Sequence, residues 1–482
     1  MLREVVSGTI AALRGVALPG LAALAVAAAP PALHAQFVTG PAAKLPAEFT
    51  PAWAAAPARR LVDLTQDPRR SAADRGAELV ARMAALQPGD ELRLHGGTYQ
   101  LGGLVEVPLR GEPGAPIRIT GQPGERVVIT RGDASQNVLN VGAQKGAPAS
   151  YAILSGLEIT GGSQGLRLLS CHHVWIDRCH IHHTREAGLT ANSANTSAVT
   201  ITRNEIDHTD GTGEGMYLGA NEGAVAMSGS LVALNHVHDT GGTQGDGIEL
   251  KQGSWGNRIV ANHVERTPYP SIIVYGTNGR AINRIERNVC EDSGDNLLQV
   301  QGEALVANNL LLRGAIGIHS HDHQGKTRDL RIVHNTILTS GPGTDFTSWN
   351  GRPGMVFANN AVYSLAGPAL SFPNGSAGVT LAGNVLFEPA GGGAHGAEHA
   401  GGPDAARGAA AGTGERGAPA GCVAGRGLSD FQHADWHGRD VDARPAAGSA
   451  LLGAADARFA VPDDLRGAAR APLLDAGCLD GP

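Results

Sequence analysis

The sequence predicts an all-β fold in which short strands wind into a parallel β-helix, a solenoid of stacked coils. From about Tyr151 onward, a short apolar phrase that contains Asn recurs at intervals of about 25 residues, and a period of this length is typical of solenoids. Each repeat holds about three strand-like stretches with no helical stretch between them, which favours a parallel β-helix over leucine-rich or helical repeats. The abundant glycine, 68 of 482 residues, supplies the tight turns that such coils need.

The Asn of the repeated phrase is interpreted as structural. Asn tolerates the left-handed backbone conformation of a tight bend, and Asn side chains on stacked coils can hydrogen-bond to one another in a ladder. The predicted ladder consists of Asn204, Asn235, Asn262, Asn288, Asn308, Asn335, Asn359 and Asn384, with Cys179 in place of Asn in the first phrase.

Residues 1–35 are predicted to be an export signal. Arg3 and Arg14 supply positive charge, an apolar run follows, and the small residue Ala35 suits cleavage after it. The apolar run is short for a bilayer span, and no other stretch is apolar enough to cross a membrane. We therefore expect a periplasmic or extracellular protein, with an uncleaved N-terminal anchor as the alternative.

The rest of the chain divides into four segments. Residues 36–70 are rich in Pro and Ala and read as an extended lead-in. Residues 71–389 are predicted to form the β-helix with an N-terminal cap, because Ser71–Leu86 has helical spacing, with Leu79 and Met83 on one face. Residues 390–426 are rich in Gly and Ala and are interpreted as a flexible linker, and residues 427–482 as a C-terminal tail segment.

Composition excludes several classes of function. The net charge of −7 provides no basic field for nucleic acid. The five cysteines include no CxxC spacing, so zinc-finger and thioredoxin-like chemistry have no support. Cys422 and Cys478 could pair in an exported protein, but the sequence does not settle whether they do. We expect a monomer.

One stretch, Gln244–Asn262, concentrates ionisable residues at the beginning of a strand. In a strand, Ile248 and Leu250 would point to one side, and Glu249 and Lys251 to the other. Asp246 shares the parity of the apolar pair, but its flanking glycines permit a bend that brings it back outward. This grouping resembles a site, although a solvated strand with alternating charges would look the same.

The repeated phrases resemble those of the right-handed parallel β-helix superfamily of pectate-lyase-like proteins. The phrases PGDELRLHGGTY and GEPGAPIRITGQPGERVVI also resemble the N-terminal part of polysaccharide lyases of that group, and the resemblance covers roughly Ser71–Pro389. In this superfamily an Asn ladder lies at the bend between the second and third strands of each coil. The resemblance implies a right-handed solenoid followed by a tail that lies back on the coils.

Stacked coils place equivalent positions about 4.8 Å apart, so the sequence predicts columns of side chains. The predicted inward column is apolar and runs through Met216, Ile248, Ile272, Leu298 and Ile316. The two predicted outward columns run through Asn192, Gly219, Lys251, Tyr275, Gln301 and His319, and through Arg167, Thr190, Tyr217, Glu249, Ile273 and Gln299. Glu214 falls beside Asp246. A solvated sheet face would carry mainly Thr, Ser and scattered charges, so this collection favours a functional site.

These residues suit β-elimination of a uronate polymer. Carboxylate oxygens are preferred ligands of Ca²⁺, so we predict a Ca²⁺ site at Glu214, Asp246 and Glu249. Lys251 is the predicted base, provided that a nearby metal ion disfavours its protonated form, and Tyr275 is the predicted acid, with His319 as a second candidate. The remaining outward polar residues are predicted to bind substrate: Arg167, Asn192, Tyr217, Gln299 and Gln301. The acids could instead hold the lysine as a salt-bridge partner.

The resemblance agrees in part with this assignment. Alginate and dermatan lyases of this fold use glutamates near a strand end for Ca²⁺, a Lys as base, and an Arg on the next coil as acid. Glu249 and Lys251 match the Glu and Lys in order, whereas Tyr275 stands where the Arg is expected.

The sequence therefore predicts an exported polysaccharide lyase that acts on an acidic, uronate-containing glycan by metal-assisted β-elimination. A non-catalytic glycan-binding or surface protein, and a C5-epimerase or hydrolase on the same scaffold, are the alternatives. A polygalacturonase-like hydrolase would require paired Asp residues and a GHG phrase, which these columns lack. The phrase IHSHDHQG, Ile318–Gly325, could place His319, His321 and His323 around a transition metal, or it could be a flexible loop.

Overall fold

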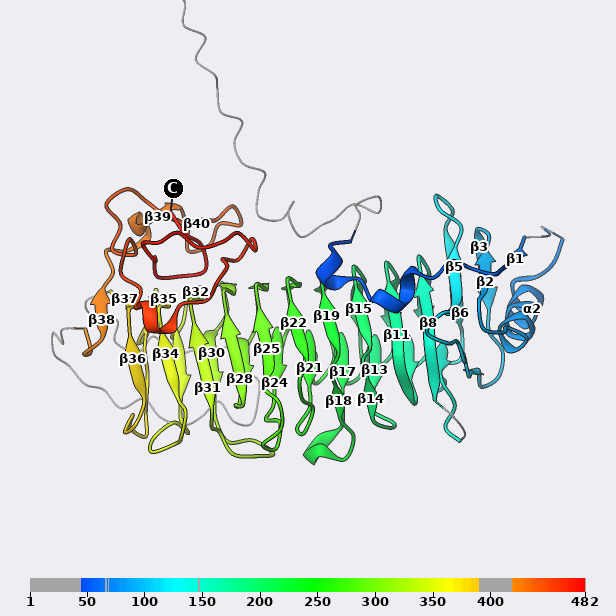
Figure 1. Ribbon diagram of the computed structural model, residues 1–482, viewed down its shortest axis with the longest axis horizontal. Coiled ribbons are helices and arrows are strands. Elements are labelled where there is room, and N and C mark those ends of the chain that lie inside the picture. Colours follow the sequence, from blue (N-terminus) through cyan, green and yellow to red (C-terminus); the bar gives the residue numbers. More distant parts are fainter. Residues whose placement is uncertain (1–44, 66, 68, 146–147, 390–417, 482) are drawn as a thin grey trace, which may run out of the picture. The chain divides into compact units, whose positions relative to one another are not determined.

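The computed structural model describes residues 45–65, 67, 69–145, 148–389 and 418–481, and most of these wind into a parallel β-helix of about 12 coils. The predicted all-β class is confirmed. Figure 1 shows the coils stacked in chain order, with the strands of each coil contributing to three long sheets. The predicted export signal, residues 1–35, and most of the predicted linker lie outside the described residues.

Each sheet runs along the stack, and every strand pair within the three sheets is parallel. Sheet A contains β1 (Arg60–Leu64), β2 (Asp90–Leu94), β5 (Ile117–Gly121), β8 (Ala149–Ser155), β11 (Cys171–Asp177), β15 (Thr200–Thr202), β19 (Leu231–Ala233), β22 (Arg258–Val260), β25 (Asn283–Glu286), β28 (Ala304–Ala307), β31 (Leu330–Val333), β34 (Val356–Ala358) and β36 (Thr380–Ala382), with β14 (Thr196–Ser197) and β18 (Met227–Ser228) beside this path.

Sheet B follows sheet A in each coil. It contains β3 (Gly97–Gln100), β6 (Val127–Arg131), β9 (Glu158–Gly161), β12 (His180–Thr184), β16 (Glu205–Thr209), β20 (His236–His238), β23 (His263–Glu265), β26 (Val289–Glu291), β29 (Leu310–Leu312), β32 (Thr336–Thr339), β35 (Ala361–Ser364), β37 (Asn384–Phe387) and β38 (Cys422–Ala424).

Sheet C completes the coil and carries the predicted site. It contains β4 (Glu106–Val107), β7 (Leu139–Val141), β10 (Leu166–Leu168), β13 (Leu189–Ala191), β17 (Met216–Leu218), β21 (Ile248–Leu250), β24 (Ile272–Val274), β27 (Asn296–Val300), β30 (Ile316–Ser320) and β33 (Thr344–Phe346). The inward side chains of the three sheets form one continuous apolar core, in which Ile248, Ile272 and Leu298 are fully buried.

The Asn ladder lies at the bend between sheets A and B. Each Asn side-chain oxygen accepts the backbone N–H of the ladder residue on the preceding coil, as Asn262 Oδ1 does from Asn235 at 3.0 Å and Asn204 Oδ1 does from Cys179 at 2.9 Å. Each side-chain N–H group donates in turn, as Asn262 Nδ2 does to Val232 O at 2.9 Å. The observed ladder consists of Asn204, Asn235, Asn262, Asn288, Asn309, Asn335, Asn360 and Asn384.

The prediction was wrong at Asn308 and Asn359. The phrases LVANNL and VFANNA each hold two adjacent Asn residues, and strand register selects the second of each pair because Ile285 pairs with Val306. Asn308 and Asn359 instead adopt positive φ at the bend and face the tail, donating to Asp463 O and Asp456 O. Their outward position makes them anchors for the tail.

One α-helix and short 3-10 turns flank the coils. The predicted N-terminal cap is confirmed as α2 (Ala72–Ala84), which begins at a capping box between Ser71 and Asp74 and buries Leu79 and Met83. The predicted lead-in is not simply extended: η1 (Ala47–Phe49) and η2 (Ala52–Ala55) lie before β1, and Phe49 packs on sheet A.

The C-terminal tail packs on the outer face of sheet B, as predicted. It contains η4 (Leu428–Asp430), β39 (Phe431–His433), β40 (Asp442–Pro445) and η5 (Ala457–Phe459). Figure 1 shows it beside β32, β35 and β37, and its apolar residues bury Leu312, Leu338 and Tyr363. Cys422–Ala424, which the sequence places at the end of the linker, forms β38 and extends sheet B.

All five cysteines lie in the described part of the chain, and all five are free, so Cys422 and Cys478 do not pair. Burial raises the pKa of Cys478 to about 12, which keeps this thiol protonated and unreactive. Among the described residues, no helix is both long and apolar enough to span a membrane. η3 (Asn221–Gly223) is a surface turn after β17 that becomes important at the candidate site.

Candidate functional site on sheet C

The strand register of sheet C brings most of the predicted residues together on its outer face. Glu249 of β21 pairs with Tyr217 of β17 on one side and with Ile273 of β24 on the other. Lys251 follows β21, and Tyr275 follows β24 one coil later, with its backbone N–H bonded to Leu250 O at 3.0 Å.

A column of glycines explains how the chain enters this sheet. At Gly247 an added Cβ would lie 2.5 Å from Ser271 O of the next coil, so only glycine allows the two backbones to approach this closely. The same crowding occurs at Gly165, Gly188, Gly215, Gly317 and Gly343. The tight approach fixes Asp246 directly before β21, and its backbone oxygen accepts the N–H of Gly215 at 2.8 Å.

A buried ion pair lies at the centre of the site. Lys251 Nζ pairs with Glu249 Oε1, and these two residues are only 4% and 3% exposed. The ammonium group lies 4.5 Å from the ring centroid of Tyr217 and 5.4 Å from that of Tyr275. The aromatic faces therefore add a cation–π contribution to the attraction from the carboxylate.

Negative charge exceeds positive charge in this cluster. Burial raises the pKa of Glu249 to about 7, although Lys251 opposes the shift. Burial also raises the pKa of Asp246 well above its usual range and raises that of Glu214, and in both cases neighbouring carboxylates add to the effect. Three buried acids thus share one lysine.

Two tests bear on whether a divalent cation fits here. Glu249 Oε2 is buried and has no hydrogen-bond partner among the described residues, as expected of an oxygen that is short of a ligand. The oxygens of Glu214, Asp246 and Glu249 do not form one of the tight groups of potential ligands, which, in the described part of the chain, all lie on sheet B. The cluster fits a cation by charge, but the three carboxylates alone do not enclose one.

Both tyrosines stay protonated at ordinary pH. Burial and the charge on Glu249 raise the pKa of Tyr217 and of Tyr275 far above the usual value for a phenol. The Tyr217 hydroxyl donates to Asn221 Oδ1 at 3.2 Å. Tyr275 can therefore act as a hydrogen-bond or proton donor, the role that the sequence predicted for it.

The predicted substrate-binding residues flank the cluster on both sides. Arg167 lies two strands before Tyr217 in the same column, and its Nε donates to Ser193 Oγ at 2.8 Å. Gln299 lies beyond Ile273 in that column. Asn192 follows β13, and its side-chain oxygen is buried with no hydrogen-bond partner among the described residues.

Gln301 is held by the fold. Its side-chain oxygen accepts the N–H of Gly276 at 3.1 Å, and its side-chain nitrogen donates to Gly325 O at 2.6 Å. This residue therefore anchors a loop of the next coil.

His319 does not lie beside Lys251. It pairs with Gln299, and Ile318 pairs with Leu298, so this coil is displaced by two residues from the predicted register. The predicted inward residue Ile316 therefore pairs with Asn296. A shift of two residues keeps the same side chains facing inward, so the alternation of apolar residues fits both registers equally well.

Sequence reasoning missed a loop that packs over the cluster, the strap His321–Gly325. Gln324 Nε2 donates to Asn221 Oδ1 at 3.1 Å, and Gln324 Oε1 accepts the N–H of Glu222 at 2.7 Å. The His323 ring lies 5.3 Å from that of Tyr275. The strap reaches back across the coils to η3, and no local sequence signal links segments about 100 residues apart.

Comparisons with known proteins agree with this architecture. A family profile described as "Right handed beta helix region" matches residues 125–284. No curated protein matches the chain. The fold and this match define a right-handed parallel β-helix protein.

Several solved structures are similar to the chain. Pectate lyase Pel9A is 17% identical with a TM-score of 0.48, over 89% of this chain and 98% of that one. An alginate lyase from Paenibacillus sp. str. FPU-7 is 17% identical with a TM-score of 0.45, over 60% and 96%. The complex of XylC with xylose is 10% identical with a TM-score of 0.46, over 63% and 79%. At these identities and scores the likenesses carry no argument about activity.

Proposed function

We propose that this protein is an exported polysaccharide lyase that cleaves an acidic, uronate-containing glycan at the Lys251–Tyr275 cluster. One observation carries the proposal. A buried lysine is held against Glu249 between two protonated tyrosines, beside two further acids, on the outer face of a sheet. A proton acceptor and a proton donor at adjacent positions are what β-elimination requires.

The residues would divide the reaction between them. Lys251 Nζ, in its neutral form, takes the C5 proton of the uronate. The electron pair of that C–H bond forms the C4–C5 double bond, and the C4–O bond breaks. The Tyr275 hydroxyl donates its proton to the departing oxygen.

A Ca²⁺ ion held by Glu214, Asp246 and Glu249 Oε2 would supply charge neutralisation of the substrate carboxylate. The excess of buried negative charge supports such an ion. Water would complete its ligand shell, as is common for Ca²⁺. Arg167 and Tyr217 on one side of the cluster and Gln299 on the other would contact neighbouring sugars.

A non-catalytic glycan-binding β-helix is the second candidate, because one observation favours it. Lys251 and Glu249 are almost completely buried, and the strap His321–Gly325 contacts the residues around them. Catalysis on a polymer would require this strap to move. Without such movement the ion pair would be structural and the glycan would bind outside the strap.

The test is ultraviolet absorbance of unsaturated uronate with alginate, pectate and glycosaminoglycans, with and without EDTA. We expect one substrate to yield unsaturated product, Lys251→Met and Tyr275→Phe to abolish it, and Lys145→Met, at an exposed lysine, to retain full activity. An altered uronate ratio without unsaturated product would indicate an epimerase. No increase in absorbance with any substrate, or full activity in a folded Lys251→Met variant, would refute the lyase mechanism.

A further inference from the structure

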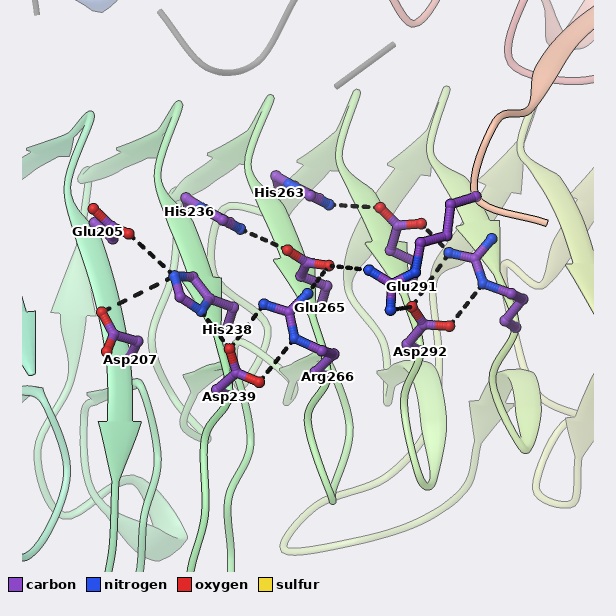
Figure 2. A network of polar contacts seen from close by, with 12 residues as sticks. Glu205, Asp207, His236, His238, Asp239, His263, Glu265, Arg266, Glu291 and Asp292 are labelled. Atoms are coloured by element: carbon purple, nitrogen blue, oxygen red, sulfur yellow. Dashed lines mark hydrogen bonds and ion pairs between the residues drawn. The ribbon is translucent and has the colours of Figure 1, made fainter. Parts of the chain in front are cut away.

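The outer face of sheet B carries a second concentration of ionisable residues, the histidine–carboxylate face. Strand β16 has acids at both of its outward positions, Glu205 and Asp207. The strands on either side, β12 and β20, have histidines at both positions that pair with these acids: His180, His182, His236 and His238. Figure 2 shows part of this face, with side chains of successive coils pointing toward one another.

Four of these side chains lie close together around the two acids of β16. The ligand atoms of His180, Glu205 and Asp207 all lie within 4.8 Å of one another. His238 Nε2 lies 3.3 Å from Glu205 Oε1 and 4.0 Å from Asp207 Oδ2 (Figure 2). His180 Nε2 lies 2.6 Å from the same oxygen of Asp207. Each acid of β16 therefore has an imidazole nitrogen near it from the coil before, His180, and from the coil after, His238.

Outer partners orient two of these groups toward that point. His238 Nδ1 lies 2.7 Å from Asp239 Oδ2, which leaves Nε2 facing Glu205 and Asp207. Asp207 Oδ1 lies 2.5 Å from His208 Nδ1, which leaves Oδ2 facing His180 and His238. A ligating histidine whose other ring nitrogen is held by a carboxylate is the usual arrangement at protein metal centres.

The neighbouring groups on this face are less suited to a cation. The ligand atoms of His236, His263 and Glu265 also lie close together. However, Glu265 pairs with Arg266, and Arg439 of the tail lies 3.9 Å from the same oxygen. These guanidinium groups already neutralise the Glu265 carboxylate, so a metal ion would gain little by binding it.

We propose that His180, Glu205, Asp207 and His238 bind one divalent transition-metal ion, of which Zn²⁺ is the best fit. Two nitrogens and two oxygens suit a tetrahedral Zn²⁺ site, whereas Ca²⁺ and Mg²⁺ prefer ligand sets made of oxygen alone. The side chains of Glu205 and His180 are 51% and 39% exposed, so an ion can enter from solvent. The ion would link three coils across a sheet that is separate from the Lys251 cluster.

Equilibrium dialysis of the chelator-treated full chain with Zn²⁺ tests the proposal. We expect one tight equivalent, and a Co²⁺-loaded sample with the visible absorption of tetrahedral coordination. Glu205→Gln and His238→Gln should each weaken that equivalent at least roughly tenfold, and Asp239→Asn roughly 10- to 100-fold, the range found for outer-shell partners. His433→Gln, at an exposed tail histidine, is the matched control and should bind Zn²⁺ as the wild type does.

Thermal unfolding provides an independent readout that needs no activity. Zn²⁺ should raise the Tm of the wild type and of His433→Gln by more than that of Glu205→Gln. The Glu205 side chain is half-exposed, so its replacement by Gln should leave the fold intact. Wild-type affinity in both Glu205→Gln and His238→Gln would overturn the proposal. Loss of binding in His183→Gln, with wild-type binding in Glu205→Gln, would also overturn it, because the ion would then occupy the group formed with His208.

Discussion

The buried pair of Glu249 and Lys251 can be tested through stability as well as activity. Lys251→Met keeps the aliphatic stem between the two tyrosine rings and removes the ammonium group that pairs with Glu249. A buried carboxylate that loses its partner either stays charged at high cost or takes up a proton. Glu249 will take up a proton, because its pKa is already raised to about 7 with the lysine in place.

The cost of that proton sets the size of the effect. A carboxyl whose folded-state pKa is raised contributes stability below its unfolded-state value of 4.5, and this stability is lost as the pH rises toward the folded-state value. At 1.36 kcal/mol per pH unit above 4.5, keeping Glu249 protonated costs on the order of 3 kcal/mol at pH 7 and less than about 1 kcal/mol at pH 5. Glu249→Gln removes this cost, because the amide is neutral at every pH.

The measurement is urea unfolding of Lys251→Met and of the double variant Glu249→Gln/Lys251→Met at both pH values. We expect the double variant to be the more stable by about 3 kcal/mol at pH 7 and by less than about 1 kcal/mol at pH 5. Both variants should lack lyase activity, so stability would be rescued without catalysis. Equal free energies of unfolding at both pH values would refute the idea that Glu249 is a buried charge held by Lys251.

Three further predictions concern the scaffold. Asn262→Ala leaves two donors of Asn235 without their acceptor and should lower the free energy of unfolding by about 2–6 kcal/mol, measured in urea. Gly247→Ala places a Cβ against Ser271 O and should cost about 1–3 kcal/mol in the same assay while lowering activity, because it displaces β21. Burial raises the pKa of Glu265, but its histidine and arginine neighbours outweigh burial and lower this pKa to about 2. Glu265→Gln should therefore lower the free energy of unfolding by its largest amount above pH 4.5, and by less as the pH falls toward 2.

Each of these predictions has a contrary result. An Asn262→Ala variant as stable as the wild type would mean that water satisfies the ladder. Wild-type stability and activity in Gly247→Ala would mean that the coils separate easily. A Glu265→Gln difference that does not change with pH would mean that its histidine and arginine partners do not depend on its charge.

The fold could be predicted from the sequence because the repeated phrase shows both the length of each coil and the position of one of its bends. The inward column through Ile248, Ile272 and Leu298 could be aligned because a slip of one residue would turn Glu249 and Lys251 into the apolar core. The predicted register was wrong where an alternative alignment placed no charged side chain in the core. Two adjacent Asn residues fit the ladder phrase equally well in either position, and a coil with longer strands accepted His319 in two alignments.

The site was predicted only as far as strand pairing determines it. Tyr217, Glu249, Lys251 and Tyr275 are neighbours because parallel register makes them so. The strap His321–Gly325 could not be predicted, because its contacts with η3 depend on how two surface loops fold. The histidine–carboxylate face did leave a signal, since several phrases continue past the bend as HIHH, EIDH and HVHD, and its meaning appears only when the coils are stacked.

The two polar faces differ in how they balance charge, and that difference locates function. In a parallel stack each side chain lies near its equivalent on the next coil, so a column of like charges is destabilising. Sheet B avoids this over β12, β16 and β20, where the acids Glu205 and Asp207 lie between strands of histidines. Sheet C does not alternate, and Glu249 has a tyrosine and an isoleucine as its neighbours on adjacent coils, with only Lys251 to offset three acids. Three buried acids with one lysine leave an excess of acidic groups on sheet C, and this imbalance favours a site that is completed by a cation or by substrate.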